Sequence, residues 1–250
     1  MQISFKNQIV VVTGAASGIG CHAVNLFVEA GAHVVALDIQ ERVDSKNEMV
    51  HDILCDVSKP ESVLSAFSEI GESHERIDVL VNNAGIQTYG DVLESSVEDW
   101  DHTLDVNLKS VFLCSKHAIP LMRSSSRPVI VNVSSVQSFI SQRKVAAYAV
   151  SKSGVNALTR CMAIDFAPHI RCVAVSPGAV LTPMLERDIA SCEDPQAATR
   201  ETEEIHLLER IASPDEIANF IVMLASDHAS FATGQVFRVD GGIGVRIEGT

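Results

Sequence analysis

Short apolar runs alternate along the chain with longer stretches in which apolar residues recur every three or four positions. The short runs are rich in valine and isoleucine and predict strands over residues 9–13, 33–37, 52–55, 78–81, 129–133, 171–175 and 235–239. The longer stretches predict helices over residues 18–30, 58–70, 96–122, 145–166 and 213–225. Residues 40–47 are polar and predict a loop or a short helix, and residues 181–208 form a second polar region.

Residues at the ends of these stretches support the assignment. Gly31 follows the first helical stretch, at a position where a left-handed backbone favours glycine. The sequences Ser58-Lys-Pro-Glu61 and Ser213-Pro-Asp-Glu216 each place a serine, a proline and an acidic residue where a helix is expected to start.

Strand followed by helix, repeated, predicts an α/β fold with a doubly wound, mostly parallel seven-stranded sheet and helices on both faces. The run 129–133 is apolar throughout, as expected for a strand covered on both sides. No break in composition marks a second unit, so we expect residues 1–250 to form a single domain. In such sheets a ligand binds beyond the carboxyl ends of the strands, where the strand order reverses.

Composition narrows the classes of function. The 32 acidic residues outnumber the 19 basic ones, for a formal charge of −13, which argues against a nucleic-acid surface because that needs a basic patch. Six scattered cysteines without a Cys-x-x-Cys pair predict reduced thiols, and the histidines form no ligand motif, so we expect no metal. The N-terminal residues lack a signal-peptide core, and no apolar run approaches the roughly 18 residues of a membrane helix. We therefore expect a cytoplasmic protein that does not bind membranes.

Tyr148 and Lys152 lie four positions apart in the helical stretch 145–166, so they share one helix face. A lysine ammonium beside a phenol favours the phenolate, and so it lowers a pKa that is about 10 in free tyrosine. Ser135 follows the strand 129–133, and a loop can bring its hydroxyl to the same point. Such a group forms a proton-transfer site for a carbonyl or an alcohol, although Tyr-x-x-x-Lys also occurs by chance on helices.

Residues 13–20 read Thr-Gly-Ala-Ala-Ser-Gly-Ile-Gly and join the first strand to the first helix. Glycine lets the backbone approach a pyrophosphate closely, and the helix N-terminus presents free N–H groups to that anion. Asp38 ends the second strand, where an acidic residue meets a ribose 2′-hydroxyl and repels a 2′-phosphate. The alternatives are a plain strand–helix turn and a turn aspartate.

Two asparagine motifs follow. Residues 82–85 read Asn-Asn-Ala-Gly and come directly after the fourth strand, where they fit a role in ordering the backbone or form an ordinary turn. Asn107 lies in the middle of the helical stretch 96–122, although asparagine is only a middling helix former. A buried polar role therefore competes with exposure on the polar face.

These motifs, in this order, resemble those of the classical short-chain dehydrogenase/reductase family over residues 9–242. The resemblance is carried by residues 13–20, Asp56-Val57, residues 82–85, Asn107, Ser135, Tyr148-x-x-x-Lys152, Pro177-Gly178 and Thr182. It implies a Rossmann fold, a nicotinamide cofactor and hydride transfer to or from a carbon that bears oxygen. It also implies a dinucleotide-binding half at about 1–125 and a catalytic and substrate-binding part at about 126–250, with a lid at about 181–208.

The resemblance assigns roles residue by residue. It makes Tyr148 the general acid/base, and Lys152 the group that lowers the pKa of Tyr148 and binds the nicotinamide ribose. Ser135 holds the substrate oxygen, and Asn107 helps to hold a water that relays the proton. The residues implied in binding NAD are Gly14, Ser17, Gly18, Ile19, Gly20, Asp38, Asp56, Val57, Asn83, Ala84, Gly85, Tyr148, Lys152, Pro177, Gly178, Val180 and Thr182.

Hydrogen-bonding side chains are common where the substrate is expected to bind. The loop between Ser135 and Tyr148 contains Gln137 and Gln142, and Gln87 is expected to face the same cleft. Few large apolar side chains accompany them, and this loop is similar to that of sugar 1-dehydrogenases of the family. A sugar or another polyhydroxylated substrate is therefore favoured over a steroid. The alternative is that these are solvated loop residues.

Two further regions remain open. Tyr89 is expected to face the same cleft as Gln87, and the sequence does not show which of Glu186, Arg187 and Asp188 in the lid contact a substrate. The helical stretches 96–122 and 145–166 carry more apolar residues than one sheet face needs, for example Val155, Leu158, Cys161 and Met162. Because family members commonly pair these helices, we expect a homotetramer or a homodimer.

Three functions are weighed. The leading one is an NAD-dependent alcohol or sugar dehydrogenase. The second is a carbonyl reductase of the 3-oxoacyl or hydroxysteroid kind, and Asp38 weighs against a version of it that uses NADPH. The third is a catalytically silent cofactor-binding scaffold, against which the intact set of Asn107, Ser135, Tyr148 and Lys152 argues.

Overall fold

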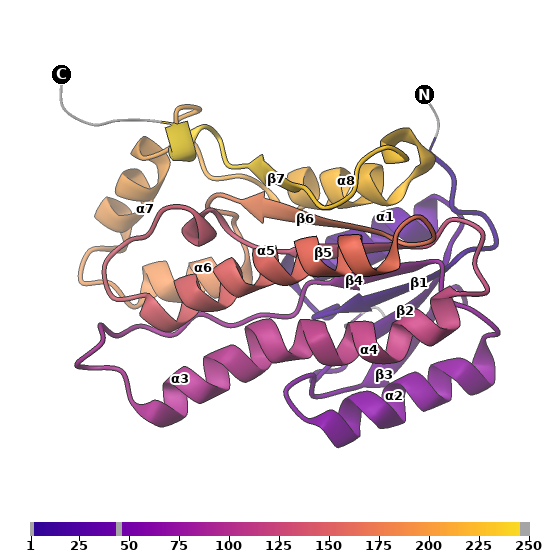
Figure 1. Ribbon diagram of the computed structural model, residues 1–250. Coiled ribbons are helices and arrows are strands. Elements are labelled where there is room, and N and C mark those ends of the chain that lie inside the picture. Colours follow the sequence, from indigo (N-terminus) through magenta and orange to yellow (C-terminus); the bar gives the residue numbers. More distant parts are fainter. Residues whose placement is uncertain (1–2, 44–46, 246–250) are drawn as a thin grey trace.

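Seven parallel strands form one sheet in the computed structural model, which describes residues 3–43 and 47–245 (Figure 1). The sheet order is β3-β2-β1-β4-β5-β6-β7, so the strand order reverses between β1 and β4. This confirms the doubly wound α/β fold expected from the sequence. The strands are β1 (Ile9–Thr13), β2 (His33–Asp38), β3 (Val50–Leu54), β4 (Val79–Asn82), β5 (Val129–Val133), β6 (Arg171–Pro177) and β7 (Val236–Val239).

Helices cover both faces of the sheet (Figure 1). They are α1 (Gly18–Glu29), α2 (Pro60–Ser73), α3 (Val97–Leu104), α4 (Ser110–Met122), α5 (Ala146–Phe166), α6 (Pro183–Ala190), α7 (Pro195–Glu204) and α8 (Pro214–Ala225). Helices α1 and α8 pack on one face, whereas α2, α4 and α5 pack on the other. None of the helices in the described part is both long and apolar enough to cross a bilayer.

The core consists of two apolar layers, one on each side of the sheet. Successive strand residues alternate between the layers: Val10 and Val12 belong to one and Val11 to the other, and all three are fully buried. In the first layer the Phe27 ring of α1 meets the Phe5 ring edge-on, with 4.9 Å between the ring centroids. The valine-rich runs are thus strands that are covered on both faces.

The predicted helix over residues 96–122 exists, but it is interrupted by one π-helical turn, Asp105–Lys109, between α3 and α4. The apolar pattern continues across this turn, so periodicity could not have revealed it. Turns of this kind are frequent at functional sites. Asn107 lies in the turn.

The polar region 181–208 contains two helices that the sequence pattern did not predict. Helices α6 and α7 have no fully buried residue, so they carry no apolar stripe that could signal them. Both begin with a proline after a capping side chain, Thr182 for α6 and Asp194 for α7. They lie beyond the carboxyl ends of the strands (Figure 1).

Two other expectations have mixed outcomes. Residues 40–43 and 47 are not helical, while residues 44–46 of the predicted loop or short helix lie outside the described residues. Val155 and Met162 were expected to be in excess of what the sheet face needs, and this is wrong, because both are buried against that face. Cys161 is exposed, and Leu158 is partly buried against the same layer.

The layer between α1 and the sheet generates the first prediction. Phe27→Ala should lower the free energy of unfolding by about 3–5 kcal/mol, because it removes a fully buried ring and leaves a cavity. Asn25→Ala on the exposed side of the same helix is the control, and it should change stability by no more than about 0.5 kcal/mol. Urea unfolding followed by circular dichroism measures both. Equal losses would contradict the assigned packing.

Candidate active site

The site is built where the strand order reverses, between the carboxyl ends of β1 and β4. The Thr13 hydroxyl accepts hydrogen bonds from the backbone N–H of Asn83 (3.0 Å) and of Ala84 (3.1 Å). In return the Asn83 side chain donates to the carbonyl oxygens of Thr13 and Gly14, both at 3.0 Å. The Asn-Asn-Ala-Gly motif therefore orders the backbone at this edge, as the sequence indicated.

The glycine-rich loop has no room for larger residues. A Cβ atom on Gly20 would lie 2.0 Å from the Gly14 carbonyl oxygen, and Gly14 has a φ of 64°, which favours glycine. Ser17 occupies the N-cap of α1, yet its side chain makes no capping hydrogen bond, and no acidic residue lies in the first turn. The first N–H groups of α1 therefore remain available to an anion such as a pyrophosphate.

Asp38 is more than a turn residue. Its Oδ2 accepts a hydrogen bond from the Ala16 backbone N–H at 2.8 Å, and its Oδ1 accepts one from the Gln40 N–H at 3.0 Å. The carboxylate at the end of β2 is thus fixed against the glycine-rich loop. Asp56, at the end of β3, instead has its Oδ1 bonded locally by the N–H and the hydroxyl of Ser58.

The loop after β6 approaches the glycine-rich loop from the other side. The Gly178 N–H donates to the Val239 carbonyl at 3.1 Å, and Val180 pairs with Ala212 as an isolated bridge. A Cβ atom on Gly18 would lie 3.1 Å from the Thr182 methyl group. Residues 177–182 and the glycine-rich loop therefore lie side by side at this edge of the sheet.

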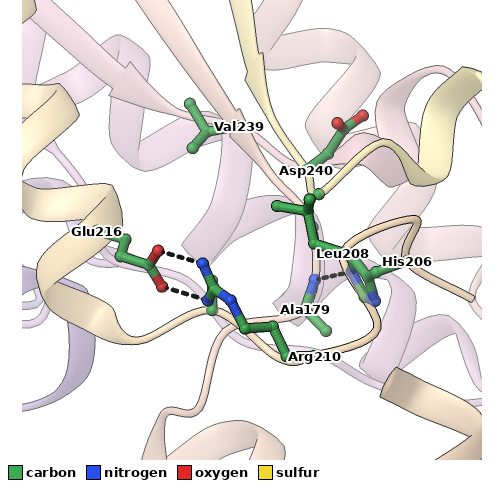
Figure 2. Close-up of a pocket in the computed structure, with 10 residues that line it drawn as sticks. Ala179, His206, Leu208, Arg210, Glu216, Val239 and Asp240 are labelled. Atoms are coloured by element: carbon green, nitrogen blue, oxygen red, sulfur yellow. Dashed lines mark hydrogen bonds and ion pairs between the residues drawn. The ribbon is translucent and has the colours of Figure 1, made fainter. Parts of the chain in front are cut away.

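His206, which sequence reasoning missed, lies beside Ala179 and holds this loop in place (Figure 2). Its ring is 2% exposed, and because a carbonyl needs a donor, Nδ1 donates to the Thr202 carbonyl (2.7 Å) while Nε2 accepts from the Ala179 N–H (3.1 Å). A Cβ atom on Gly178 would lie 2.7 Å from Nε2, and one on Gly241 would lie 3.1 Å from Cδ2. The ring thus requires both glycines. A lone histidine has no spacing signal, so nothing in the sequence could have revealed it.

The pocket beside His206 is a separate feature from the predicted catalytic group. Arg210 and Glu216 line it and are joined by two hydrogen bonds of 2.7 and 2.6 Å (Figure 2). Glu216 also accepts a hydrogen bond from the backbone N–H of Ser213, the N-cap residue of α8. The hydrogen bonds from Arg210 and from the Ser213 N–H lower the pKa of Glu216 to about 2. None of Asn107, Ser135, Tyr148 and Lys152 lines this pocket.

Tyr148 and Lys152 stand on the first turns of α5, as the four-residue spacing predicted. Lys152 is 4% exposed, and its ammonium donates to the Val133 carbonyl at the end of β5, at 2.9 Å. The ammonium nitrogen lies 5.7 Å from the centroid of the Tyr148 ring. Ser135 follows β5, and its hydroxyl lies near enough to the Tyr148 phenol to oppose the rise in its pKa. The structure therefore brings the three predicted groups together.

The direction of the Tyr148 pKa differs from the sequence prediction. Burial raises the pKa of the phenol, and the negative charge of Asp188 adds to the rise, while the hydrogen bond with Ser135 opposes it. Burial also lowers the pKa of Lys152, to about 8. Lys152 was expected to lower the Tyr148 pKa, but its ammonium is directed to the Val133 carbonyl. The dominant effect on both groups is loss of solvent.

Asn107 is buried, 1% exposed, so the alternative of a solvated polar face is wrong. Its Oδ1 accepts the Ile86 N–H at 2.8 Å, and its Nδ2 donates to the Ile86 carbonyl at 2.8 Å and to the Ser151 hydroxyl at 3.1 Å. A Cβ atom on Gly85 would lie 3.3 Å from the Lys152 ammonium and 3.4 Å from Asn107 Oδ1. Gly85 thus leaves the space in which these two side chains converge.

The residues that were expected to contact the substrate differ in their surroundings. The Gln87 amide donates to the Tyr89 hydroxyl at 2.8 Å, and that hydroxyl donates to Asp188 Oδ2 at 3.0 Å. Gln137 Oε1 is buried and has no partner in the described part of the chain. Gln142 is exposed, and its side chain bonds none of the described site residues, so the structure does not bring it to the group.

Chemically, the assembled groups can move a proton. A half-buried phenol, a hydroxyl and an ammonium lie together beside an anion-binding loop, which suits proton transfer at an alcohol or carbonyl oxygen. Over residues 3–43 and 47–245, no three histidine, cysteine or acidic side chains are grouped so that they could hold a metal ion.

Comparisons with known proteins agree with this chemistry. Residues 14–244 match the family model described as enoyl-(acyl carrier protein) reductase. The chain is 38% identical to the 3-oxoacyl-(acyl-carrier-protein) reductase of Thermotoga maritima, covering 95% of this chain and 98% of that protein. It is 35% identical to the cyclopentanol dehydrogenase of Comamonas testosteroni, covering 95% and 97%. The structure superimposes on the ligand-free aldohexose dehydrogenase of Thermoplasma acidophilum with a TM-score of 0.93 and 38% identity, covering 98% and 97%.

Proposed function

Because this chain belongs to the short-chain dehydrogenase/reductase family and is an oxidoreductase acting on alcohol and carbonyl groups, we propose that it is an NAD-dependent dehydrogenase of a sugar or another polyhydroxylated substrate. The observation that carries the substrate class is the chain of polar side chains Gln87, Tyr89 and Asp188 beside Tyr148. Likeness to an aldohexose dehydrogenase supports it. These polar side chains would lose their bound water when a substrate enters, so a substrate whose hydroxyls replace those hydrogen bonds is favoured.

The cofactor fits the cradle between the glycine-rich loop and the loop after β6. Gly14, Ser17 and Gly20 would face its pyrophosphate, and Asp38, held by two backbone N–H groups, would accept hydrogen bonds from the adenosine ribose. The other residues that the sequence implies in binding NAD would also contact the cofactor: Gly18, Ile19, Asp56, Val57, Asn83, Ala84, Gly85, Pro177, Gly178, Val180 and Thr182. When bound, NAD supplies an acceptor for the hydride of the substrate carbon.

The chain's own residues handle the oxygen and its proton. Tyr148, as phenolate, removes the hydroxyl proton, and Ser135 holds the same oxygen in position. Lys152 stays fixed by the Val133 carbonyl, where its ammonium can bind a ribose hydroxyl of the cofactor. Asn107 lies in the π-helical turn and is held by two hydrogen bonds with the Ile86 backbone. It supports a path of water molecules for the proton. In the reductive direction the same phenol gives the proton back.

A second candidate is reduction of a 3-oxoacyl thioester. It is favoured by the 38% identity to a 3-oxoacyl-(acyl-carrier-protein) reductase over nearly the whole chain. The two candidates use the same proton-transfer group and differ in what surrounds it. The polar groups on α6 and on the loop after β4 suit hydroxyls better than an acyl chain, so the dehydrogenase is the first choice.

A screen of sugars and alcohols with NAD and with NADP, followed by absorbance of the reduced cofactor, tests the function. We expect turnover with NAD on hydroxyl-rich substrates and a kcat/KM for NAD at least about tenfold above that for NADP, since Asp38 repels a 2′-phosphate. Asp38→Asn, which keeps the size of the side chain, should narrow this ratio. Equal use of NADP by the unaltered enzyme contradicts the role of Asp38, and activity only on 3-oxoacyl thioesters favours the second candidate.

The Tyr148 mechanism predicts a matched pair of effects. Tyr148→Phe keeps the ring but removes the proton carrier, so turnover should fall by about 10²–10⁴-fold or more while NAD still binds. Oxidation by the unaltered enzyme should rise with pH through the pKa of the Tyr148 site, because only the phenolate accepts the proton, and that rise should vanish in the variant. Stopped-flow turnover and fluorescence titration of NADH measure the two. Retention of most turnover would rule out the phenol as the proton acceptor.

We further propose that the chain assembles as a homodimer or homotetramer through the outer side of α4 and α5. Phe112, Val150 and Ile164 on these helices expose 50%, 48% and 79% of their surface, and exposed apolar groups of this kind mark interfaces. Light scattering at micromolar concentration should give two or four chains. Ile164→Glu should reduce that mass, whereas Leu64→Glu on α2, a residue 53% exposed, should not. A monomeric mass for the unaltered protein would refute the proposal.

A further inference from the structure

One hydrogen bond joins two segments that are 99 positions apart in the chain. The Tyr89 hydroxyl, in the loop after β4, donates to Asp188 Oδ2 on α6 at 3.0 Å. The same hydroxyl accepts from the Gln87 amide at 2.8 Å, so its proton is directed to the carboxylate. The lid helix is therefore tied to the loop that follows the Asn-Asn-Ala-Gly motif.

This loop also adjoins the segment that leads into α5. The Gly90 N–H donates to the Lys144 carbonyl at 2.8 Å, Gly90 bridges Val145, and the Lys144 ammonium pairs with Glu94 at 2.9 Å. The loop after β4 is thus joined both to helix α6 and to the segment that leads into α5, the helix of Tyr148.

Of the three acidic and basic lid residues that the sequence singled out, Asp188 is the one directed inward. Glu186 and Arg187 are exposed, whereas Asp188 is half-buried. Burial raises the pKa of Tyr148, and the negative charge of Asp188 adds to that rise. That charge also raises the pKa of Tyr89, together with burial and their hydrogen bond.

The carboxylate of Asp188 has unused capacity. A carboxylate accepts about four hydrogen bonds, but the Asp188 side chain accepts only the one from Tyr89 among the residues that the structure describes. No lysine, arginine or histidine of the described ranges forms an ion pair with it. It is a partly desolvated anion with a free acceptor oxygen beside the reacting group.

We propose that Asp188 is a specificity-determining residue, which accepts a hydrogen bond from a second hydroxyl of the substrate while Tyr89 holds its carboxylate in place. The site then selects neutral substrates that carry a further hydroxyl and rejects substrates that carry an anionic group at the same position. The inference rests on the proposed function, because that function places the reacting hydroxyl of the substrate at Tyr148.

Three ring alcohols that differ in one substituent test this: cyclohexanol, cyclohexane-1,4-diol and 4-hydroxycyclohexanecarboxylate. The unaltered enzyme with NAD should show the highest kcat/KM for the diol and the lowest for the carboxylate. Asp188→Asn keeps the shape of the side chain but removes its charge. The ratio of kcat/KM for the diol to kcat/KM for the carboxylate should therefore fall by about 10–100-fold, mainly through changes in KM. The kcat of this variant on cyclohexanol at the high-pH plateau should change by no more than about threefold.

Glu186→Gln on the same helix is the matched control, since it removes the same charge from an exposed position. It should leave all three kcat/KM values unchanged. Tyr89→Phe keeps the ring but frees the carboxylate, so KM for the diol should rise while kcat on cyclohexanol is kept. If Asp188→Asn and Tyr89→Phe instead lower activity on all three alcohols equally, the pair only holds the lid, and the specificity role is overturned.

A pH profile on cyclohexanol provides a readout that a structural role would not move. The groups that face Tyr148 are Ser135, Lys152 from α5 and Asp188 from α6. Removing the negative charge of Asp188 should move the rise of kcat to lower pH, whereas Glu186→Gln should not move it. An unchanged profile in Asp188→Asn would overturn the inference. Turnover of sugars by the unaltered enzyme without activity on any of the three ring alcohols would also overturn the inference while the proposed function stands, and turnover of no hydroxyl-rich substrate at all would overturn both.

Discussion

The position of the Lys152 ammonium constrains the rest of the site. A charged group with 4% exposure is costly unless it is hydrogen-bonded, and its acceptor is the Val133 carbonyl at the end of the buried strand β5. Gly85 leaves room for the ammonium, since a Cβ atom there would lie 3.3 Å from Lys152 Nζ. The end of β5, the turn after β4 and helix α5 must therefore keep their relative positions for the ammonium to remain satisfied, and these are the elements that carry the catalytic group.

Much of the fold could be predicted because the strands are buried on both faces. A run such as Ile9–Thr13 is apolar for a physical reason, and its bounds follow directly from the sequence. Helices α6 and α7 escaped because they bury no residue, and the π-helical turn escaped because the apolar pattern runs through it. Sequence periodicity reports burial, so elements that are not buried, or that change geometry without changing burial, leave no trace in it.

The candidate site shows the same division. Tyr148 and Lys152 share a helix face by spacing alone, and their convergence was predictable. The direction of the Tyr148 pKa was not, because it depends on desolvation and on Asp188, which is 40 positions away in the chain. His206 and the Tyr89–Asp188 bond depend on where the lid returns to the sheet, which no local pattern specifies.

The lid differs from the catalytic group in how it is held. Helices α6 and α7 have no fully buried residues, so polar bonds at separate points fix them: the Thr182 cap, the Tyr89–Asp188 bond and the His206 ring beneath Ala179. Each such bond contributes about 0.5–1.5 kcal/mol net, far less than a buried helix face contributes. Segments held in this way open at lower free energy than the core does. Helices α6 and α7 are therefore held less firmly than Tyr148 and Lys152, which stand on the packed helix α5. The bonds that hold α6 and α7 come from polar groups, and a hydroxyl-bearing substrate offers hydrogen bonds of the same kind.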